Sequence, residues 1–260
     1  SLVGSEMCIR DRSILAAVRP EGMQGGKDPV VFLGLNLDGP EGQFGYTVPH
    51  LLIDHAMRNP PIPPGFWRGV NLNQNAVYVE CFMDELAHAA GVDPLTFRRK
   101  LMKNHPKHLA ALNAVAQGVE WETPAAPGVH RGLAQIMGFG SYVAAAAEVS
   151  VTSGQLKIHR IVASTDTGHI VNPAQAQRQI EGSFVYGLSA ALFSECTVTS
   201  GRMNEDNFNT YQLMRMAQMP AVETHLLASG GFWGGVGEPT IAVAAPAVLN
   251  AVFAATGKRI

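Results

Sequence analysis

Cysteine is scarce in this sequence, with three residues in 260, at positions 8, 81 and 196. None of them forms a CxxC pair or has a histidine at the spacing of a zinc motif, so we expect neither an iron–sulfur cluster nor structural zinc within the chain. An odd, sparse set also gives no disulfide framework and does not identify the compartment. The nine histidines contain neither HxxxH nor HExxH spacing, so we expect no metal ligands among them.

Charge and long apolar runs are also limited. Charged residues make up 15% of the chain and the net charge is -2, which gives no reason to expect nucleic acid or an anionic membrane surface as a partner. No apolar run reaches the length that a bilayer requires, so we expect no membrane insertion. A chain of 260 residues that is 47% hydrophobic can bury the core of one large or two small globular domains.

Both ends of the chain look cut. The sequence does not begin with methionine, and residues 1–12 (SLVGSEMCIRDR) resemble translated adapter sequence from metagenomic fragments. We therefore predict that residues 1–12 are non-native and exclude them from fold reasoning. We expect residues 13–260 to be the C-terminal fragment of a longer domain, truncated at both ends. Because any export signal would precede this fragment, the sequence leaves localisation open.

Hydrophobic spacing and end signals predict five helices, at about residues 74–90, 94–101, 107–117, 174–193 and 241–255. Asp93 followed by Pro94 is a strong helix start, and Gly91 is a favoured helix end. Residues 13–48 read as strands and loops, with an apolar run at 30–35. Residues 49–73, which contain the proline-rich run at 60–65, read as a rigid connection.

Two longer strands, residues 143–151 and 155–163, are predicted to form a hairpin through the turn at 152–154. Leu156, Ile158 and Val162 are expected to share one strand face. Short strands are also expected within residues 197–226. This order does not alternate as a βαβ series would, so we predict an α+β fold with mixed helices and a small antiparallel sheet. Its sub-segments would span about 13–125 and 126–260.

The stretch at residues 234–239 (GGVGEP) surrounds one carboxylate, Glu238, with three glycines and a proline. Glycine permits close approach to the main chain, and proline restricts the residue before it. Glu238 is therefore either a residue that favours the positive end of the following helix or a buried functional carboxylate. Taken alone, the motif favours the helix-end interpretation.

Other stretches carry similar alternatives. Arg68, beside Trp67, is either a surface cation or a planar fork presented to an anion. Gln74 either begins a helix or contacts a ligand. Gly182 lies within a predicted helix, where glycine costs about 1 kcal/mol relative to alanine, so close packing or a ligand is needed to explain it. Asp166 with the following Gly168 is either an ordinary Asx turn or part of a site.

Three blocks in order are more specific than any of these motifs. The first contains Trp67, Arg68, Gly69, Val70, Gln74, Asn75, Glu80, Asp84, Glu85, Leu86 and Ala87, with Asp93, Pro94, Arg98 and Arg99 beyond them. The second contains Asp166, Gly168, Asn172, Pro173, Gln179, Ile180, Glu181, Gly182, Gly187 and Leu188, and the third Gly235, Val236, Gly237, Glu238 and Pro239. From about residue 20 onward, the chain resembles the molybdopterin-binding large subunit of the xanthine dehydrogenase/aldehyde oxidoreductase family, particularly its isoquinoline 1-oxidoreductase beta-type branch.

The resemblance implies roles for individual residues. In that family the glycine-flanked glutamate is the general base beside the molybdenum, and the matching residue here is Glu238. Oxygen would come from water, and the metal would take up the electrons. The cofactor-binding residues implied by the three blocks are Arg68, Gly69, Val70, Asn71, Gln74, Gln179, Gly182, Gly235, Val236 and Gly237. Asp166 and Asn172 are expected to shape their loop rather than to touch substrate.

The resemblance also implies a cofactor and partners. The cofactor would be molybdopterin, in its cytosine dinucleotide form, whose own sulfur atoms hold the molybdenum, so no protein metal ligand is expected. Electrons would leave through 2Fe-2S clusters on a separate small subunit to a downstream acceptor such as a cytochrome or quinone. The substrate would be an N-heterocycle or an aldehyde. The alternatives are a non-catalytic assembly subunit that keeps the fold without the cofactor, and a fragment that is inactive alone.

Overall fold

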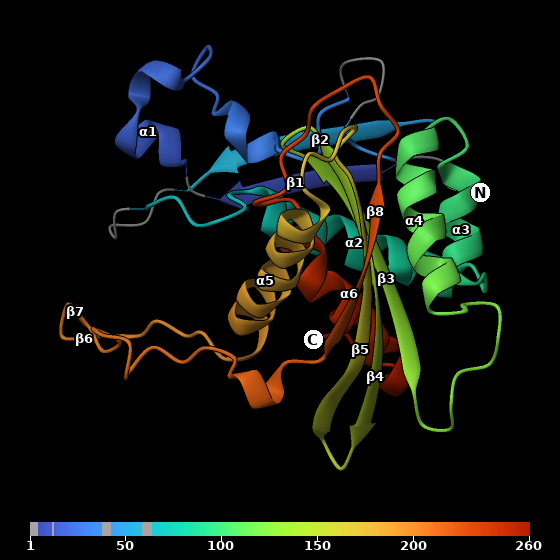
Figure 1. Cartoon of the computed structure of the whole chain (residues 1–260). Helices are drawn as coiled ribbons and strands as arrows, with labels where there is room; N and C mark the ends of the chain where they lie inside the picture. The colour runs from blue at the N-terminus through green and yellow to red at the C-terminus, as the bar shows by residue number, and fades with distance from the viewer. Residues whose placement is uncertain (1–4, 12, 38–42, 59–63) are drawn as a thin grey trace.

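The computed structural model of the chain describes residues 5–11, 13–37, 43–58 and 64–260 (Figure 1). Residues 59–63 of the predicted rigid connection lie outside the described residues. The strands are β1 Ser5–Asp11, β2 Leu51–Met57, β3 His130–Gly138, β4 Ser141–Thr152, β5 Gln155–Asp166, β6 Val198–Thr199, β7 Arg202–Met203 and β8 Ala221–Leu227. The helices are α1 Ile14–Val18, α2 Leu72–Ala89, α3 Pro94–Leu101, α4 Pro106–Gly118, α5 Pro173–Leu192 and α6 Ile241–Thr256, with 3-10 turns at Pro20–Gly22, Pro29–Phe32 and Met216–Gln218.

A four-stranded sheet in the order β3-β4-β5-β8 lies at the centre of the molecule. β3, β4 and β5 are antiparallel neighbours, whereas β8 pairs with β5 in parallel. The sheet is therefore mixed, where the sequence predicted an antiparallel one. A parallel pair needs a crossover, and α5 with the chain after it makes that connection. Figure 1 shows this later stretch, with β6 and β7, as an arm that projects from the body.

The hairpin of β4 and β5 turns at Ser153 and Gly154, both with positive φ, as the sequence predicted. A bulge then interrupts the pairing, because Glu148 faces Arg160 while Val149 faces Ile158. One extra residue reverses which face the following side chains occupy. The prediction that Leu156, Ile158 and Val162 share a face is therefore wrong: Leu156 and Ile158 pack against one core and Val162 belongs to the other.

The two cores lie on opposite faces of the sheet. On one face, α5 and α6 pack on β4 and β5 through residues such as Phe184, Val248 and Ile161. On the other, α4 packs on the same strands through residues such as Leu112, and α3, which contacts α2, adds residues such as Phe97 to this core. α2 contributes to both cores and contacts α6 and β3. No helix within the described part of the chain is both long and apolar enough to cross a membrane.

The predicted helices are confirmed to within two residues at each described end. Asp93 accepts from the Thr96 amide at 2.8 Å, and Gly91 adopts a left-handed φ of 63° directly after α2. Residues 13–48, predicted as strands and loops, instead contain the short helix α1 and two 3-10 turns, and the apolar run at 30–35 is no strand. A 3-10 turn starts at Pro29 instead, and the Asp28 side chain caps it by accepting from the Val30 amide at 2.8 Å.

The short strands expected within residues 197–226 are confirmed by β6, β7 and β8, although the parallel pairing of β8 with β5 was not predicted. β3 was not predicted, and neither was the parallel pair of β1 with β2, since β2 lies in the stretch predicted as a rigid connection. β1 lies within residues 1–12, which we predict to be non-native. The non-native origin of this segment stays a prediction. β3 carries Gly132 and Gln135 within its apolar run, which weakens its strand pattern. Gly132 is needed there because a Cβ would meet the α6 backbone at Ala251 N and Ala247 O.

A buried polar network joins α2, α3, β3 and α6. Arg98 donates to Glu80 at 3.0 Å and approaches Asp84 at 3.5 Å, and Tyr46 donates to Glu80 at 2.6 Å. Asn250 of α6 donates to the carbonyls of Glu80 (3.1 Å) and Leu133 (2.8 Å). Glu80, Asp84 and Arg98 of the first sequence block therefore hold these elements together.

Candidate functional site

The loop that carries Glu238 runs from β8 to α6 and is pressed against the turn between β3 and β4. The Gly234 amide donates to the Thr167 carbonyl and the Gly235 amide to the Phe139 carbonyl, both at 2.9 Å. The Ser141 hydroxyl donates to the Gly235 carbonyl at 2.5 Å. A Cβ at Gly234 would meet Ser141 Oγ and the Gly140 carbonyl, so the close approach requires glycine.

The Glu238 carboxylate is held by another loop. The backbone amide of Gly69 donates to Glu238 Oε1 at 3.0 Å, across 169 positions of sequence. Gly69 and Val70 have φ values of 91° and 48°, and Asn73 holds this left-handed turn by donating to the Arg68 carbonyl (2.8 Å) and the Val70 carbonyl (3.3 Å). A non-glycine residue at positive φ is strained and persists only where its surroundings enforce it. This contact favours a fixed carboxylate over one that merely marks the start of α6.

Arg68 connects three segments around that carboxylate. Its Nε donates to the Gly237 carbonyl at 2.6 Å. Its Nη2 donates to Gln179 Oε1 and Ser183 Oγ of α5, each at 3.2 Å. The guanidinium therefore links Gly237, the residue before Glu238, to α5. Gly69, whose amide donates to Glu238, is the next residue in the chain after Arg68.

An aromatic contact supports the same arrangement. The rings of Trp67 and Tyr186 stack with centroids 4.7 Å apart and an interplanar angle of 27°. The Arg68 guanidinium lies 5.7 Å from the centroid of the Tyr186 ring, within cation–π range. Two successive residues of the loop thus contact one ring of α5.

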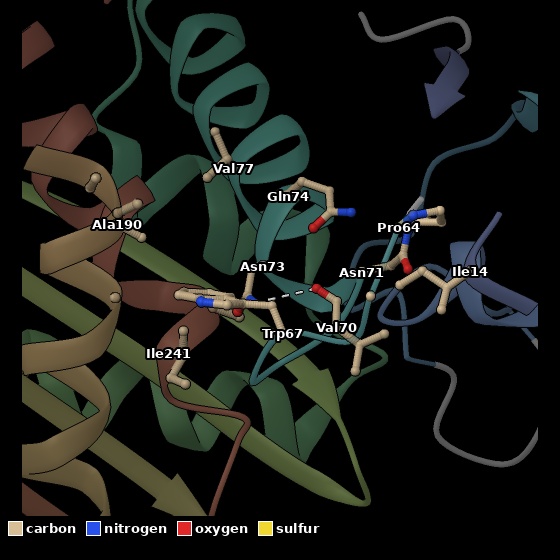
Figure 2. Close-up of a pocket in the computed structure, with 15 residues that line it drawn as sticks. Ile14, Pro64, Trp67, Val70, Asn71, Asn73, Gln74, Val77, Ala190 and Ile241 are labelled. Atoms are coloured by element: carbon tan, nitrogen blue, oxygen red, sulfur yellow. Dashed lines mark hydrogen bonds between the residues drawn. The ribbon is translucent and has the colours of Figure 1, made fainter. Parts of the chain in front are cut away.

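Two cavities flank this cluster. The larger, of about 430 Å³, lies between α2, α5 and α6 and is lined by Trp67, Val70, Asn71, Gln74 and Ala190, among others (Figure 2). The smaller, of about 270 Å³, is lined by residues such as His169, Gln179, Trp233 and Val236. His169 and Trp233 stack at 4.5 Å in its wall.

The structure divides the predicted site residues into groups. Those brought together in one hydrogen-bonded cluster are Arg68, Gly69, Gln179, Gly237 and Glu238. Val70, Asn71 and Gln74 line the larger cavity, Val236 lines the smaller one, and Gly235 anchors the Glu238 loop. Gly182 lies apart from the cluster, in a groove with Glu181 and Met219, and a Cβ there would meet nothing within 4 Å.

Sequence reasoning missed three residues that contact Arg68 of the cluster: Asn73, Ser183 and Tyr186. Ser183 and Tyr186 follow Gln179 by four and seven positions, so helical spacing from Gln179 would have found them. The structural roles expected of Asp166 and Asn172 are confirmed. Asp166 accepts from the Gly168 amide (2.9 Å), and Asn172 caps α5 by accepting from the Gln175 amide (3.1 Å).

The donors at the site suit an organic ligand better than a bare cation. The guanidinium of Arg68 and the amide of Gln179 present N–H groups, which bind oxygen and ring-nitrogen acceptors. Space remains beside them, since a Cβ at Gly237 would also meet nothing within 4 Å. Over the described residues, no group of three or more His, Cys, Asp or Glu side chains is placed to hold a metal ion.

Comparison with known proteins places the chain in a family. A family profile described as "Molybdopterin cofactor-binding domain" matches residues 69–220, more than half of the chain. The chain is 28% identical over 224 residues to isoquinoline 1-oxidoreductase subunit beta of Brevundimonas diminuta, covering 84% of this chain and 29% of that protein. It is 29% identical over 218 residues to a membrane-bound aldehyde dehydrogenase (pyrroloquinoline-quinone) of Gluconacetobacter polyoxogenes, covering 76% of this chain and 28% of that protein.

The fold resembles that of a solved structure. It is similar to that of quinoline 2-oxidoreductase from Pseudomonas putida 86, with a TM-score of 0.70 and 13% identity over 88% of this chain and 53% of that one. The chain spans less than a third of the length of the two curated relatives. The family predicted from the three sequence blocks is confirmed, and the chain belongs to the molybdopterin cofactor-binding domain family of the molybdenum hydroxylases.

Proposed function

We propose that this chain is part of a molybdenum hydroxylase subunit that catalyses water-dependent oxidative hydroxylation, with Glu238 as the general base. The observation that carries the proposal is the hydrogen-bonded cluster of Arg68, Gly69, Gln179, Gly237 and Glu238. The Gly69 amide orients the carboxylate at 3.0 Å, and Arg68 ties the neighbouring Gly237 to α5. A base must be held in position before its proton affinity matters, and this arrangement holds it.

Molybdopterin fits the donors present. Gln179 and Arg68 would hold its polar groups, and the open faces at Gly182 and Gly237 leave room for it. When bound, the cofactor supplies a metal that accepts two electrons from the substrate. We propose the cytosine dinucleotide form, which the resemblance to the isoquinoline 1-oxidoreductase branch implies.

Glu238 itself would move one proton. Its Oε1 is occupied by the Gly69 amide, so we assign Oε2 as the atom that takes a proton from the water-derived nucleophile. The new C–O bond would form at the substrate carbon as its C–H bond breaks, and the hydrogen would leave with its two electrons to the bound cofactor. Val70, beside this turn, lines the larger cavity, which is the space we assign to the substrate side of the site.

The relatives indicate the substrate class and partners. One is named for isoquinoline and another for aldehydes, so we propose an N-heterocycle or an aldehyde as substrate. The name "subunit beta" also indicates an assembly of several chains. We propose a separate small 2Fe-2S subunit that passes electrons to a downstream acceptor.

Substitution of Glu238 tests the base assignment in the full-length subunit produced with its small subunit. Glu238→Gln keeps shape and hydrogen-bond capacity but cannot take the proton. We expect turnover to fall by at least about 100-fold, with molybdenum content by elemental analysis unchanged. Glu195→Gln, at an exposed position, is the matched control and should keep full activity. Full activity in Glu238→Gln would refute the base assignment, and absence of molybdenum from the wild-type protein would favour the non-catalytic alternative.

A further inference from the structure

We infer that Ser183 and Tyr186 of α5 are positioning residues, which hold the Arg68 guanidinium so that the Glu238 turn keeps its geometry. The inference rests on the proposed function, because it assigns these residues to the same site. Neither residue belongs to the sequence blocks that indicated the family, and both reach Arg68 from the face of α5 that carries Gln179.

Ser183 acts as a fixed acceptor. Its hydroxyl proton goes to the Gln179 carbonyl at 2.8 Å, one helical turn earlier. A hydroxyl has one proton, so its oxygen lone pairs are left to accept the Arg68 Nη2 proton at 3.2 Å. Ser183 is 0% exposed, so water cannot replace this contact readily.

Tyr186 acts through its ring face. It stacks on Trp67 at 4.7 Å and receives the Arg68 guanidinium at 5.7 Å. One aromatic side chain therefore restrains two successive residues of the loop. The packing of α5 into the core is carried by other residues, Ile180, Phe184 and Leu188, which are each fully buried.

Through Arg68, the contacts with Ser183 and Tyr186 affect both the backbone that carries Glu238 and the donor that binds its carboxylate. Arg68 donates to the carbonyl of Gly237, the residue before Glu238. Gly69, the residue after Arg68, donates its amide to the Glu238 carboxylate. A loosened Arg68 therefore releases both the backbone beside Glu238 and the donor on its Oε1, and a misplacement of about 1 Å is enough to cost up to 100-fold in rate.

The test uses Ser183→Ala and Tyr186→Leu in the full-length subunit with its small subunit, each alone and combined with Arg68→Met. We expect each single change to lower kcat about 10-fold, with KM and molybdenum content within about 2-fold of wild type. Added to Arg68→Met, neither change should lower kcat further, because residues that act through one partner are not additive. Tyr186→Phe keeps the ring and should recover most of the turnover that Tyr186→Leu loses.

Ser189→Ala is the matched control. Ser189 is also buried on α5 and donates to the carbonyl four residues earlier, Val185, at 2.6 Å, but its oxygen accepts from the Met214 amide rather than from Arg68. It should leave kcat unchanged. Equal losses in Ser183→Ala and Ser189→Ala, or full additivity with Arg68→Met, would overturn the positioning role.

A second readout needs no cofactor. In the unloaded protein, hydrogen exchange at the Gly69 amide should speed up at least about 10-fold in Ser183→Ala and Tyr186→Leu but not in Ser189→Ala. If the wild-type protein lacks molybdenum, the proposed function fails, whereas this exchange measurement still decides the contact between α5 and Arg68. Unchanged exchange at Gly69 in both variants would refute the inference on its own.

Discussion

Arg98 and Arg99 are adjacent residues with opposite surroundings. The Arg98 side chain is 0% exposed and is paired with Glu80 and Asp84, whereas Arg99 is 38% exposed and is paired with Glu122, which is 81% exposed. Burial disfavours the charge on Arg98, but the Glu80 carboxylate, with further help from Asp84, raises its pKa. The guanidinium therefore stays charged inside the protein and must keep its partners.

Removing one member of this buried set should be costly. We predict that Arg98→Met lowers the free energy of unfolding by about 3–5 kcal/mol, because it leaves buried carboxylates without their cation. Arg99→Met, one position on, should cost less than about 1 kcal/mol, since solvent screens an exposed pair. Urea unfolding followed by circular dichroism measures both. Equal midpoints for the two variants would contradict this account of the network.

At the scale of an element, α5 carries two interior glycines with different roles. At Gly187 a Cβ would lie 2.7 Å from the Ala244 Cβ and 3.0 Å from the Ile241 carbonyl, so glycine allows α5 and α6 to approach closely. At Gly182 a Cβ would meet nothing within 4 Å. The cost of that second glycine is therefore not explained by packing, and we propose that the cofactor approaches the helix there.

Alanine substitutions should separate these roles. Gly187→Ala should destabilise the protein by about 1–3 kcal/mol through overpacking. Gly182→Ala should stabilise the unloaded protein by about 0.5–1 kcal/mol, because alanine favours the helix interior and fits the space. Thermal unfolding of the cofactor-free protein measures both. A loss of stability in Gly182→Ala would show that this face of α5 is already occupied by protein.

At the scale of the whole molecule, charged side chains link all four strands of the central sheet. Glu148 of β4 accepts from Arg131 of β3 at 2.9 Å and from Arg160 of β5 at 3.1 Å. Arg160 in turn lies 3.5 Å from Glu223 of β8, which contacts His225 at 2.9 Å. Burial works against the charge on Glu148, but the hydrogen bonds from the two arginines outweigh it and hold its pKa below the ordinary value of 4.5.

This pKa shift predicts a pH dependence of global stability. A carboxylate whose pKa is lowered by folding contributes stability that is complete above its unfolded value of 4.5 and is lost as pH falls through the lower folded value. Glu148→Gln should therefore be less stable than wild type by about 1–2 kcal/mol at pH 7, with the difference shrinking below pH 4.5. Urea midpoints at neutral and acidic pH measure it, with Glu122→Gln as an exposed control. A difference that persists unchanged at pH 3 would exclude the ionised carboxylate as its source.

The sequence by itself determined five of the helices, α2 to α6, together with the hairpin turn and the family. The signals that allowed this act over a few residues, so they can be read without knowledge of the fold. They are caps such as Asp93, the glycines around Glu238 and the spacing within each block. The same spacing rule, applied from Gln179, would have reached Ser183 and Tyr186. The bulge before Ile161 was beyond this reach, because it depends on how two strands pair rather than on either strand alone.

Only the tertiary structure decided which residues meet. Arg68 reaches Gly237 across 169 positions and Ser183 across 115, and no local pattern encodes such distances. Likewise, β3 becomes a strand because the sheet and the helices that cover it satisfy its backbone, although its own sequence is a weak strand former, and the parallel pairing of β8 with β5 depends on the crossover between them. Packing free energy depends on all the surfaces buried together, and for this reason the sequence identified Glu238 while the fold identified what holds it.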